Sequence, residues 1–142
     1  MVIYIHVGGN KPMKIETHKE ALKEYLSHIE QAKHNVENSK RLLLIACSQA
    51  ATEAVSILLH KLNILDESSI IKHNQLDSTR WWSELPDFEN KSKISDLAAK
   101  IERKRALAYG TLKSITHDDL FQNISLVFEL KEAIEEVSHE TL

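Results

Sequence analysis

A short basic segment, Arg103-Lys104-Arg105, followed by Tyr109, is the part of this sequence best suited to bind a phosphate. An arginine guanidinium is always charged and matches phosphate geometry, and a tyrosine hydroxyl can add a hydrogen bond. If residues 92–115 form one helix, Arg105 falls within its apolar face with Tyr109 on the flank. Arg103 then points the opposite way. Because a buried guanidinium is costly unless it is paired, Arg105 requires a carboxylate, a subunit interface or a water-filled groove that admits a ligand.

Two interpretations of Arg105 follow from this position. In the structural one, an acid such as Glu53 in the preceding long helix pairs with its charge, or the charged end reaches solvent. In the functional one, Arg105 and Tyr109 form an anion site for phosphate. The spacing of the residues leaves both interpretations open.

The order and lengths of the helical segments resemble those of the HEPN superfamily. The similarity is greatest to its small prokaryotic members that pair with minimal nucleotidyltransferases, and it covers roughly residues 17–137. It rests on three strings, which are Gln49-Ala50-Ala51-Thr52-Glu53-Ala54, Glu102-Arg103-Lys104-Arg105-Ala106-Leu107-Ala108-Tyr109-Gly110 and Glu129-Leu130-Lys131-Glu132-Ala133-Ile134. The resemblance implies a helical bundle that is commonly dimeric and belongs to a toxin–antitoxin pair.

Many members of that superfamily are metal-independent ribonucleases, and the resemblance implies which residues would act. Their motif is an arginine, four to six residues and then a histidine, with a polar residue often supplied by an earlier helix. Here Arg103 is followed after five residues by Tyr109, where the family has histidine, and counting from Arg105 leaves only three. The implied catalytic residues are Arg103, Arg105, Tyr109 and Glu53. The arginines would bind phosphate, Tyr109 would position it, and Glu53 would orient an arginine.

The tyrosine in place of histidine affects the expected chemistry. Cleavage of RNA through its own 2′-hydroxyl needs a base and an acid, and histidine exchanges a proton near neutral pH. A tyrosine hydroxyl, with a pKa of about 10, does so poorly. A protein with Tyr109 at this position is therefore expected to bind phosphate but to cleave RNA slowly. The alternative is a non-catalytic dimeric module that binds a nucleotidyltransferase partner, which would attach a nucleotide to Tyr109.

Other residues that could do chemistry give weaker patterns. Glu136 and His139 have the Glu-x-x-His spacing of di-iron bundles, but the chain has no second string of this kind, so no metal or cofactor is expected. His73 and His117 lie near the predicted ends of elements, and either could approach Arg105 and supply the missing base. The Trp81-Trp82 pair is expected to pin a loop to the core or to form a dimer contact, rather than to stack on bases.

Composition indicates the class of fold that must position these residues. Three glycines and two prolines among 142 residues are too few for a turn-rich β fold, and the length suits one domain. The net charge of −3 excludes capture of duplex DNA by a broad basic face. A single cysteine, Cys47, excludes a disulfide framework, and the sequence shows neither a run of roughly 18 apolar residues nor a signal peptide. A cytoplasmic protein is expected.

The predicted architecture is an all-α, up-and-down bundle of four to five helices over residues 17–142. Residues 1–16 are predicted to be a strand-like or flexible extension, with a strand at 2–7 ended by the segment 8–12. The bundle helices are expected at 17–39, 40–65, 68–76, 92–115 and from 117 onward. Capping boxes at Thr17 and Thr116 begin the first and last of them, and the second, apolar on all sides, is the central helix.

Overall fold

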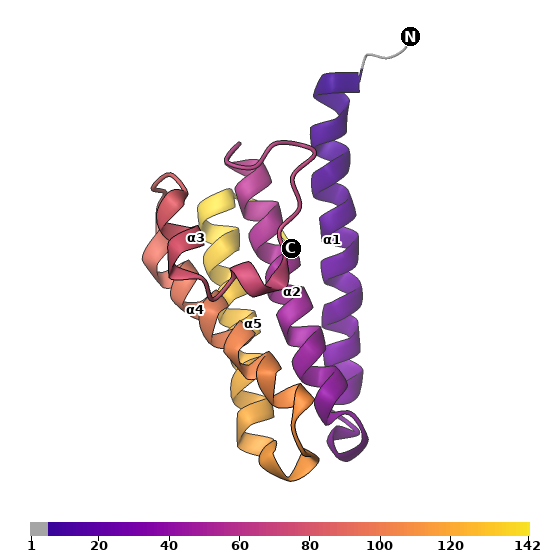
Figure 1. Ribbon diagram of the computed structural model, residues 1–142. Coiled ribbons are helices and arrows are strands. Elements are labelled where there is room, and N and C mark those ends of the chain that lie inside the picture. The colour runs from indigo at the N-terminus through magenta and orange to yellow at the C-terminus, as the bar shows by residue number, and fades with distance from the viewer. Residues whose placement is uncertain (1–5) are drawn as a thin grey trace.

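The chain forms five α-helices within the part that the computed structural model describes, which is residues 6–142 for the backbone and residues 14–142 except Leu112 for the side chains. The helices are α1 (His6–Ala32), α2 (Lys40–Lys61), α3 (Thr79–Glu84), α4 (Lys91–Arg105) and α5 (His117–Ser138). Short 3-10 turns lie at Val36–Asn38, His73–Gln75, Ala106–Tyr109 and Leu112–Ser114. The four long helices run alternately up and down (Figure 1), which confirms the predicted all-α bundle.

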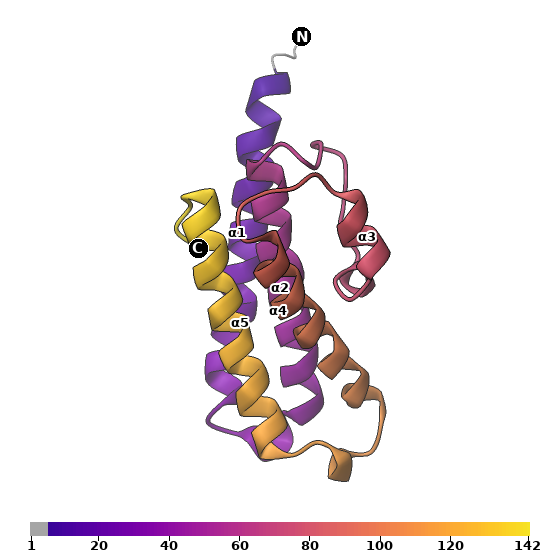
Figure 2. The same ribbon diagram turned by 90° about the vertical axis from the view of Figure 1, so that its left-hand side faces the viewer.

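The central helix is α2, as its apolar sequence predicts. It packs against α1 on one side and against α4 and α5 on the other (Figures 1 and 2). Leu44, Val55 and Leu58 are completely buried in it, and its alanines let neighbouring helices approach closely. Burial also raises the pKa of the Cys47 thiol to about 12, so Cys47 is an unreactive core residue.

The length and composition of α2 also match those of a membrane-spanning helix, with a mean hydropathy of 1.8 over its most apolar window. The sequence holds no unbroken run of roughly 18 apolar residues, yet by length and composition α2 is a candidate for such a helix. Of that window, 78% is buried inside the bundle, which is typical of the core helix of a soluble protein as well. The composition of α2 alone does not decide between the two environments.

The first helix begins earlier than the sequence indicates. Residues 1–5, and with them most of the predicted strand at 2–7, lie outside the described residues. From His6 onward the chain is helical, so the strand predicted at 2–7 is wrong at residues 6 and 7, and Thr17 lies inside α1 instead of capping it. An isolated strand would leave its backbone groups without partners, whereas a helix bonds them within itself. The same helix ends at Ala32, before the predicted end near residue 39.

The fourth helix ends ten residues before the predicted boundary at 115, because another helix binds the backbone that follows it. Arg41, near the start of α2, donates from Nε to the carbonyl of Ala108 at 3.1 Å and from Nη2 to that of Gly110 at 2.9 Å. Lys40 donates to the carbonyl of Ile115 at 3.3 Å. These tertiary hydrogen bonds satisfy carbonyls that a longer helix would have bonded internally, and the segment forms 3-10 turns instead.

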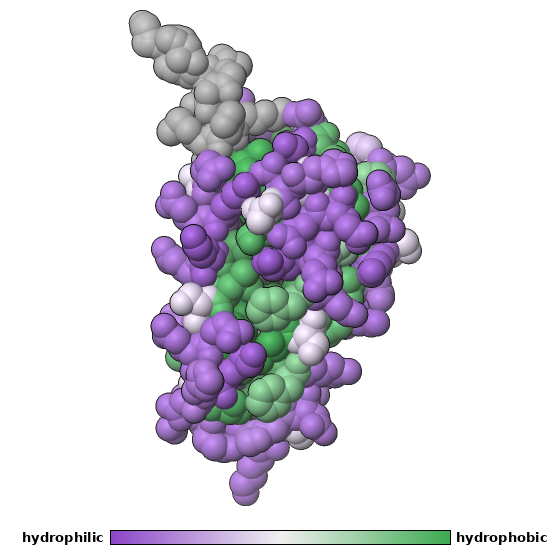
Figure 3. Space-filling model, turned by 180° about the vertical axis from the view of Figure 1, so that it is seen from behind, coloured by the Kyte–Doolittle hydropathy of each residue, from purple (hydrophilic) through white to green (hydrophobic). Residues whose placement is uncertain are grey.

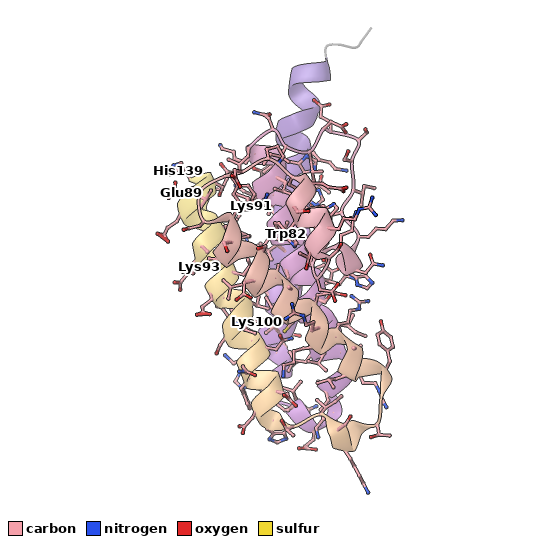
Figure 4. The ribbon with its side chains drawn as sticks, turned by 60° about the vertical axis from the view of Figure 1, so that its left-hand side comes forward. Trp82, Glu89, Lys91, Lys93, Lys100 and His139 are labelled. Carbon is pink, nitrogen blue, oxygen red and sulfur yellow. The ribbon has the colours of Figure 1, made fainter. Side chains whose placement is uncertain are left out.

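The tryptophan pair pins the segment between α2 and α4, as expected, although it does so from a short helix rather than from a loop. Ser78 caps α3 by accepting a hydrogen bond from the backbone of Trp81. Trp82 is buried (Figure 4) and donates from its indole nitrogen to the carbonyl of Leu76 at 2.8 Å. The predicted helix at 68–76 is reduced to the single 3-10 turn His73–Gln75.

The contact between α1 and α2 contains a pair of stacked histidines, His18 and His60, whose ring centroids are 5.3 Å apart. Burial of His60 lowers its pKa, and the nearby positive charges of His18 and Lys14 lower it further. The Leu65 backbone and Asp66 oppose this shift to a smaller extent. In the folded protein His60 therefore takes up a proton only at a lower pH than it does in the unfolded chain.

The lowered pKa of His60 predicts that the stability of the bundle depends on pH. A histidine in the unfolded chain takes up a proton at about pH 6.5. Below that pH the unfolded chain binds a proton that folded His60 does not yet bind, so acidification favours unfolding until folded His60 is protonated as well. We expect the free energy of unfolding, measured by urea denaturation, to fall as the pH is lowered from about 7 to about 5. His60→Leu should reduce this dependence, whereas His34→Leu, at an exposed position, should leave it unchanged. An equally steep dependence in His60→Leu would show that other groups cause it.

Candidate phosphate-binding site

The guanidinium of Arg105, at the end of α4, is held between two hydroxyl groups. Its Nε donates to the Tyr109 hydroxyl at 3.2 Å, and its Nη1 donates to Ser48 Oγ on α2 at 3.1 Å. The 3-10 turn that follows α4 places Tyr109 four residues further along, beside the same guanidinium. The structure thus brings together Arg105 and Tyr109, the two residues of the predicted anion site.

A buried carboxylate lies behind this pair. Glu102, which is 7% exposed, accepts a hydrogen bond from Ser48 at 2.6 Å through Oε1. Its Oε2 lies 2.7 Å from Nδ1 of His73, in the 3-10 turn between α2 and α3. Hydrogen bonds therefore connect His73, Glu102, Ser48, Arg105 and Tyr109 in this order. These five residues are called the Arg105 cluster below.

The sequence places the inner members of the cluster by helical spacing. Glu102 precedes Arg105 by three residues, so both lie on the same side of α4, toward α2. Ser48 belongs to the stretch of small residues in α2, where α4 approaches closely enough for a direct hydrogen bond. Glu102 was not among the predicted site residues, although its spacing from Arg105 was a usable signal. Ser48 carried no comparable signal, because its partners come from another helix.

Glu53 does not lie beside Arg105, contrary to the prediction that it pairs with or orients an arginine. Its Oε2 lies 2.5 Å from Nδ1 of His18 on α1. Glu53 follows Ser48 by five residues, which turns it by roughly 140° around the axis of α2. Because Ser48 faces α4, Glu53 faces α1 instead.

The three residues of the basic segment, Arg103 to Arg105, lie in three different environments. Arg103 is exposed, and within the described part of the chain no hydrogen bond or ion pair joins its side chain to another residue. Lys104 binds Asp119 at 2.7 Å, and this hydrogen bond is the main cause of the lowered pKa of that carboxyl group. Asp119 in turn forms the predicted capping box with Thr116 at the start of α5. Only Arg105 takes part in the cluster.

Arg105 differs from Lys104 because its charge is not neutralised by a direct partner. Within the described part of the chain, no carboxylate oxygen lies within 4.0 Å of its guanidinium nitrogens. The nearest negative charge in the network belongs to Glu102, which is separated from Arg105 by the Ser48 hydroxyl. Arg105 is half-buried and Tyr109 is 71% exposed, so solvent or a ligand reaches this side of the cluster. The arrangement suits the binding of an anion such as phosphate.

The remaining histidines lie elsewhere. Nε2 of His117 is 2.5 Å from Oε1 of Glu37, so of the two histidines considered as a base only His73 joins the cluster. His139 lies at the C-terminal end of α5 (Figure 4) and is exposed. Among the side chains that the structure describes, no group of three or more histidine, cysteine, aspartate or glutamate residues is placed to hold a metal ion.

The molecule also carries apolar surface away from the cluster. A groove of about 390 Å³ lies between the end of α1 and the start of α2, and Tyr25, His28 and Leu42 are among its lining residues. Leu42 is 69% exposed. A band of apolar side chains also runs between polar ones on the face seen in Figure 3. Surface of this kind is common where proteins associate.

The fold and the cluster define a small helical bundle with a half-buried arginine suited to bind an anion. Comparison of the chain with protein-family models, with curated proteins and with solved structures finds no match. The HEPN resemblance therefore remains a prediction from the sequence.

Proposed function

We propose that this protein is a HEPN-like component of a toxin–antitoxin pair that binds RNA through Arg105 and cleaves it without a metal ion. One observation carries the proposal: two uncharged hydroxyl groups hold the guanidinium of Arg105, and no described carboxylate pairs with it directly. Its positive charge is oriented and remains available to a phosphate group. This supports the functional interpretation of Arg105 over the structural one.

Each neighbour of Arg105 has a role in this proposal. The Tyr109 hydroxyl accepts from Arg105 and keeps its own proton to donate to a phosphate oxygen. Ser48, which accepts from Arg105 and donates to Glu102, fixes the guanidinium in the orientation that the phosphate meets. As the 2′-oxygen of RNA attacks phosphorus, negative charge grows on the phosphate oxygens, and a positioned guanidinium stabilises it.

The experiment that tests this function is an RNA cleavage assay with the purified protein in the presence of EDTA. We expect several unstructured RNAs to be cut into fragments that end in a 2′,3′-cyclic phosphate, because the attacking group is the RNA's own 2′-hydroxyl. RNA with 2′-O-methyl groups should bind and remain intact. Failure to cut any of the RNAs above the level of a mock preparation would contradict the proposal.

A second function is favoured by the exposure of Tyr109. Its ring is 71% exposed and its hydroxyl lies beside a positive charge, so the hydroxyl is accessible to a nucleotidyltransferase partner and to the phosphates that such an enzyme carries. In this version the protein is a non-catalytic dimeric module that binds and is modified by the partner. Mass spectrometry after co-expression should find one added nucleotide on the peptide with Tyr109, and an unmodified peptide without a complex would exclude it.

Both versions include a homodimer in the cytoplasm. The apolar band of Figure 3 supports association between copies, because apolar surface is removed from water when they meet. Light scattering in solution tests the oligomeric state, and a mass of twice that of the chain is the expected result.

A further inference from the structure

The proposed ribonuclease lacks a proton acceptor at Tyr109, and His73 is placed to fill this role. His73 comes from the 3-10 turn between α2 and α3, far in sequence from the basic segment. Its Nδ1 lies 2.7 Å from Oε2 of Glu102, whose other oxygen accepts the Ser48 hydroxyl. That hydroxyl also accepts from Arg105. One carboxylate and one hydroxyl therefore hold the imidazole and the phosphate-binding arginine in a common framework.

The carboxylate determines which nitrogen of His73 carries the proton. Glu102 is buried, with 8% of its side chain exposed, and as a carboxylate it only accepts hydrogen bonds. In the neutral ring the proton is therefore on Nδ1, and the lone pair of Nε2 is directed away from Glu102. The His73 side chain is 37% exposed, so a ligand can approach Nε2 from solvent.

The geometry points to His73 as the general base that removes the proton from the 2′-hydroxyl of an RNA whose phosphate is bound by Arg105, with Glu102 as its positioning residue. This inference rests on the proposed ribonuclease function. Ser48 is completely buried and connects Glu102 to Arg105, so its part in the cluster is to position these two side chains.

The reaction step conserves atoms and charge. Nε2 of His73 accepts the proton of the 2′-hydroxyl while the 2′-oxygen forms a bond to phosphorus. The bond between phosphorus and the 5′-oxygen breaks, its electron pair goes to that oxygen, and water supplies the proton of the new 5′-hydroxyl. The other RNA end keeps a 2′,3′-cyclic phosphate, and the imidazolium returns its proton to solvent.

Three other histidines of the described helices are less suited to this role. His117 is bound to Glu37, and His18 and His60 lie stacked between α1 and α2, with His18 also bound to Glu53. The hydrogen bonds of these three residues do not connect them to Arg105. A histidine in the segment between α2 and α3 is not found by the spacing rule of the family, since it comes from a different part of the chain.

The test compares His73→Ala and His73→Gln with the exposed control His34→Ala in the metal-free RNA assay. Glutamine can still donate a hydrogen bond to Glu102 but cannot take up a proton. This variant therefore distinguishes the loss of a base from the loss of the hydrogen bond to Glu102. Both His73 variants should lose about 10²- to 10³-fold in kcat with KM little changed, as expected for removal of a general base. Added imidazole should restore part of the activity of His73→Ala, and the acid limb of the pH–rate profile should disappear in both variants.

The outcomes separate this inference from the proposed function. Binding of 2′-O-methyl RNA should be the same for the unaltered protein and the His73 variants, because phosphate binding is assigned to Arg105. If the unaltered protein cleaves RNA and His73→Gln cleaves it equally well, His73 is not the base and the ribonuclease function stands. If the unaltered protein cleaves no RNA, both proposals are overturned. Weaker binding of 2′-O-methyl RNA by His73→Gln would make His73 a binding residue and overturn its role as a base.

Discussion

Replacing Arg105 with alanine is expected to lower the rate of RNA cleavage by roughly 10²- to 10³-fold, the loss typical when one group that stabilises transition-state charge is removed. Arg105 is the only member of its cluster that carries a positive charge at all pH values, and its guanidinium is oriented by Tyr109 and Ser48. Alanine removes both the positive charge and the hydrogen-bond donors of the guanidinium. The measurement is kcat/KM on a labelled RNA in EDTA.

Two further variants make this result specific. Arg105→Lys keeps a positive charge but loses the bidentate geometry, so its activity should lie between those of the unaltered protein and Arg105→Ala. Arg103→Ala removes an exposed arginine two residues away on the same helix, and we expect only a small loss from weaker attraction of RNA. The family spacing, counted from Arg103 to Tyr109, makes the opposite prediction. A larger loss in Arg103→Ala than in Arg105→Ala would place the site on the outer face of α4.

Replacing Leu58 with alanine is expected to lower the free energy of unfolding by about 3 kcal/mol. Leu58 lies in α2, which packs against α1, α4 and α5, and its side chain is completely buried. Alanine removes apolar contacts and leaves a cavity that neighbouring helices fill only in part. Urea denaturation followed by circular dichroism measures the change, since the whole fold is helical.

Leu42→Ala is the matched control, because it makes the same substitution in the same helix at a side chain that is 69% exposed. Helix propensity is nearly equal or slightly improved, so the free energy of unfolding should change by less than about 0.5 kcal/mol. A large loss of stability in Leu42→Ala that grows as the protein concentration is raised would reveal that Leu42 is buried in a dimer. Equal small losses in both variants would contradict the central position of α2.

The sequence determined the elements whose signals are local. The capping box of Thr116 and Asp119 marks the true start of α5, because both hydrogen bonds form within one turn. The apolar sequence of α2 indicated the central helix of the bundle, and most of its side chains are buried there. The scarcity of glycine and proline indicated an all-α fold. These features depend on neighbouring residues, and they were confirmed.

Only the tertiary structure decided the end of α4 and the composition of the candidate site. The helix stops at Arg105 because Arg41, distant in sequence, binds carbonyls of the following segment. The acid near Arg105 is Glu102 rather than Glu53, because the rotation of α2 directs Glu53 toward His18. His73 joins Glu102 only because the segment after α2 returns across the bundle. Long-range hydrogen bonds depend on where chain segments meet, and residue spacing along one helix does not contain that information.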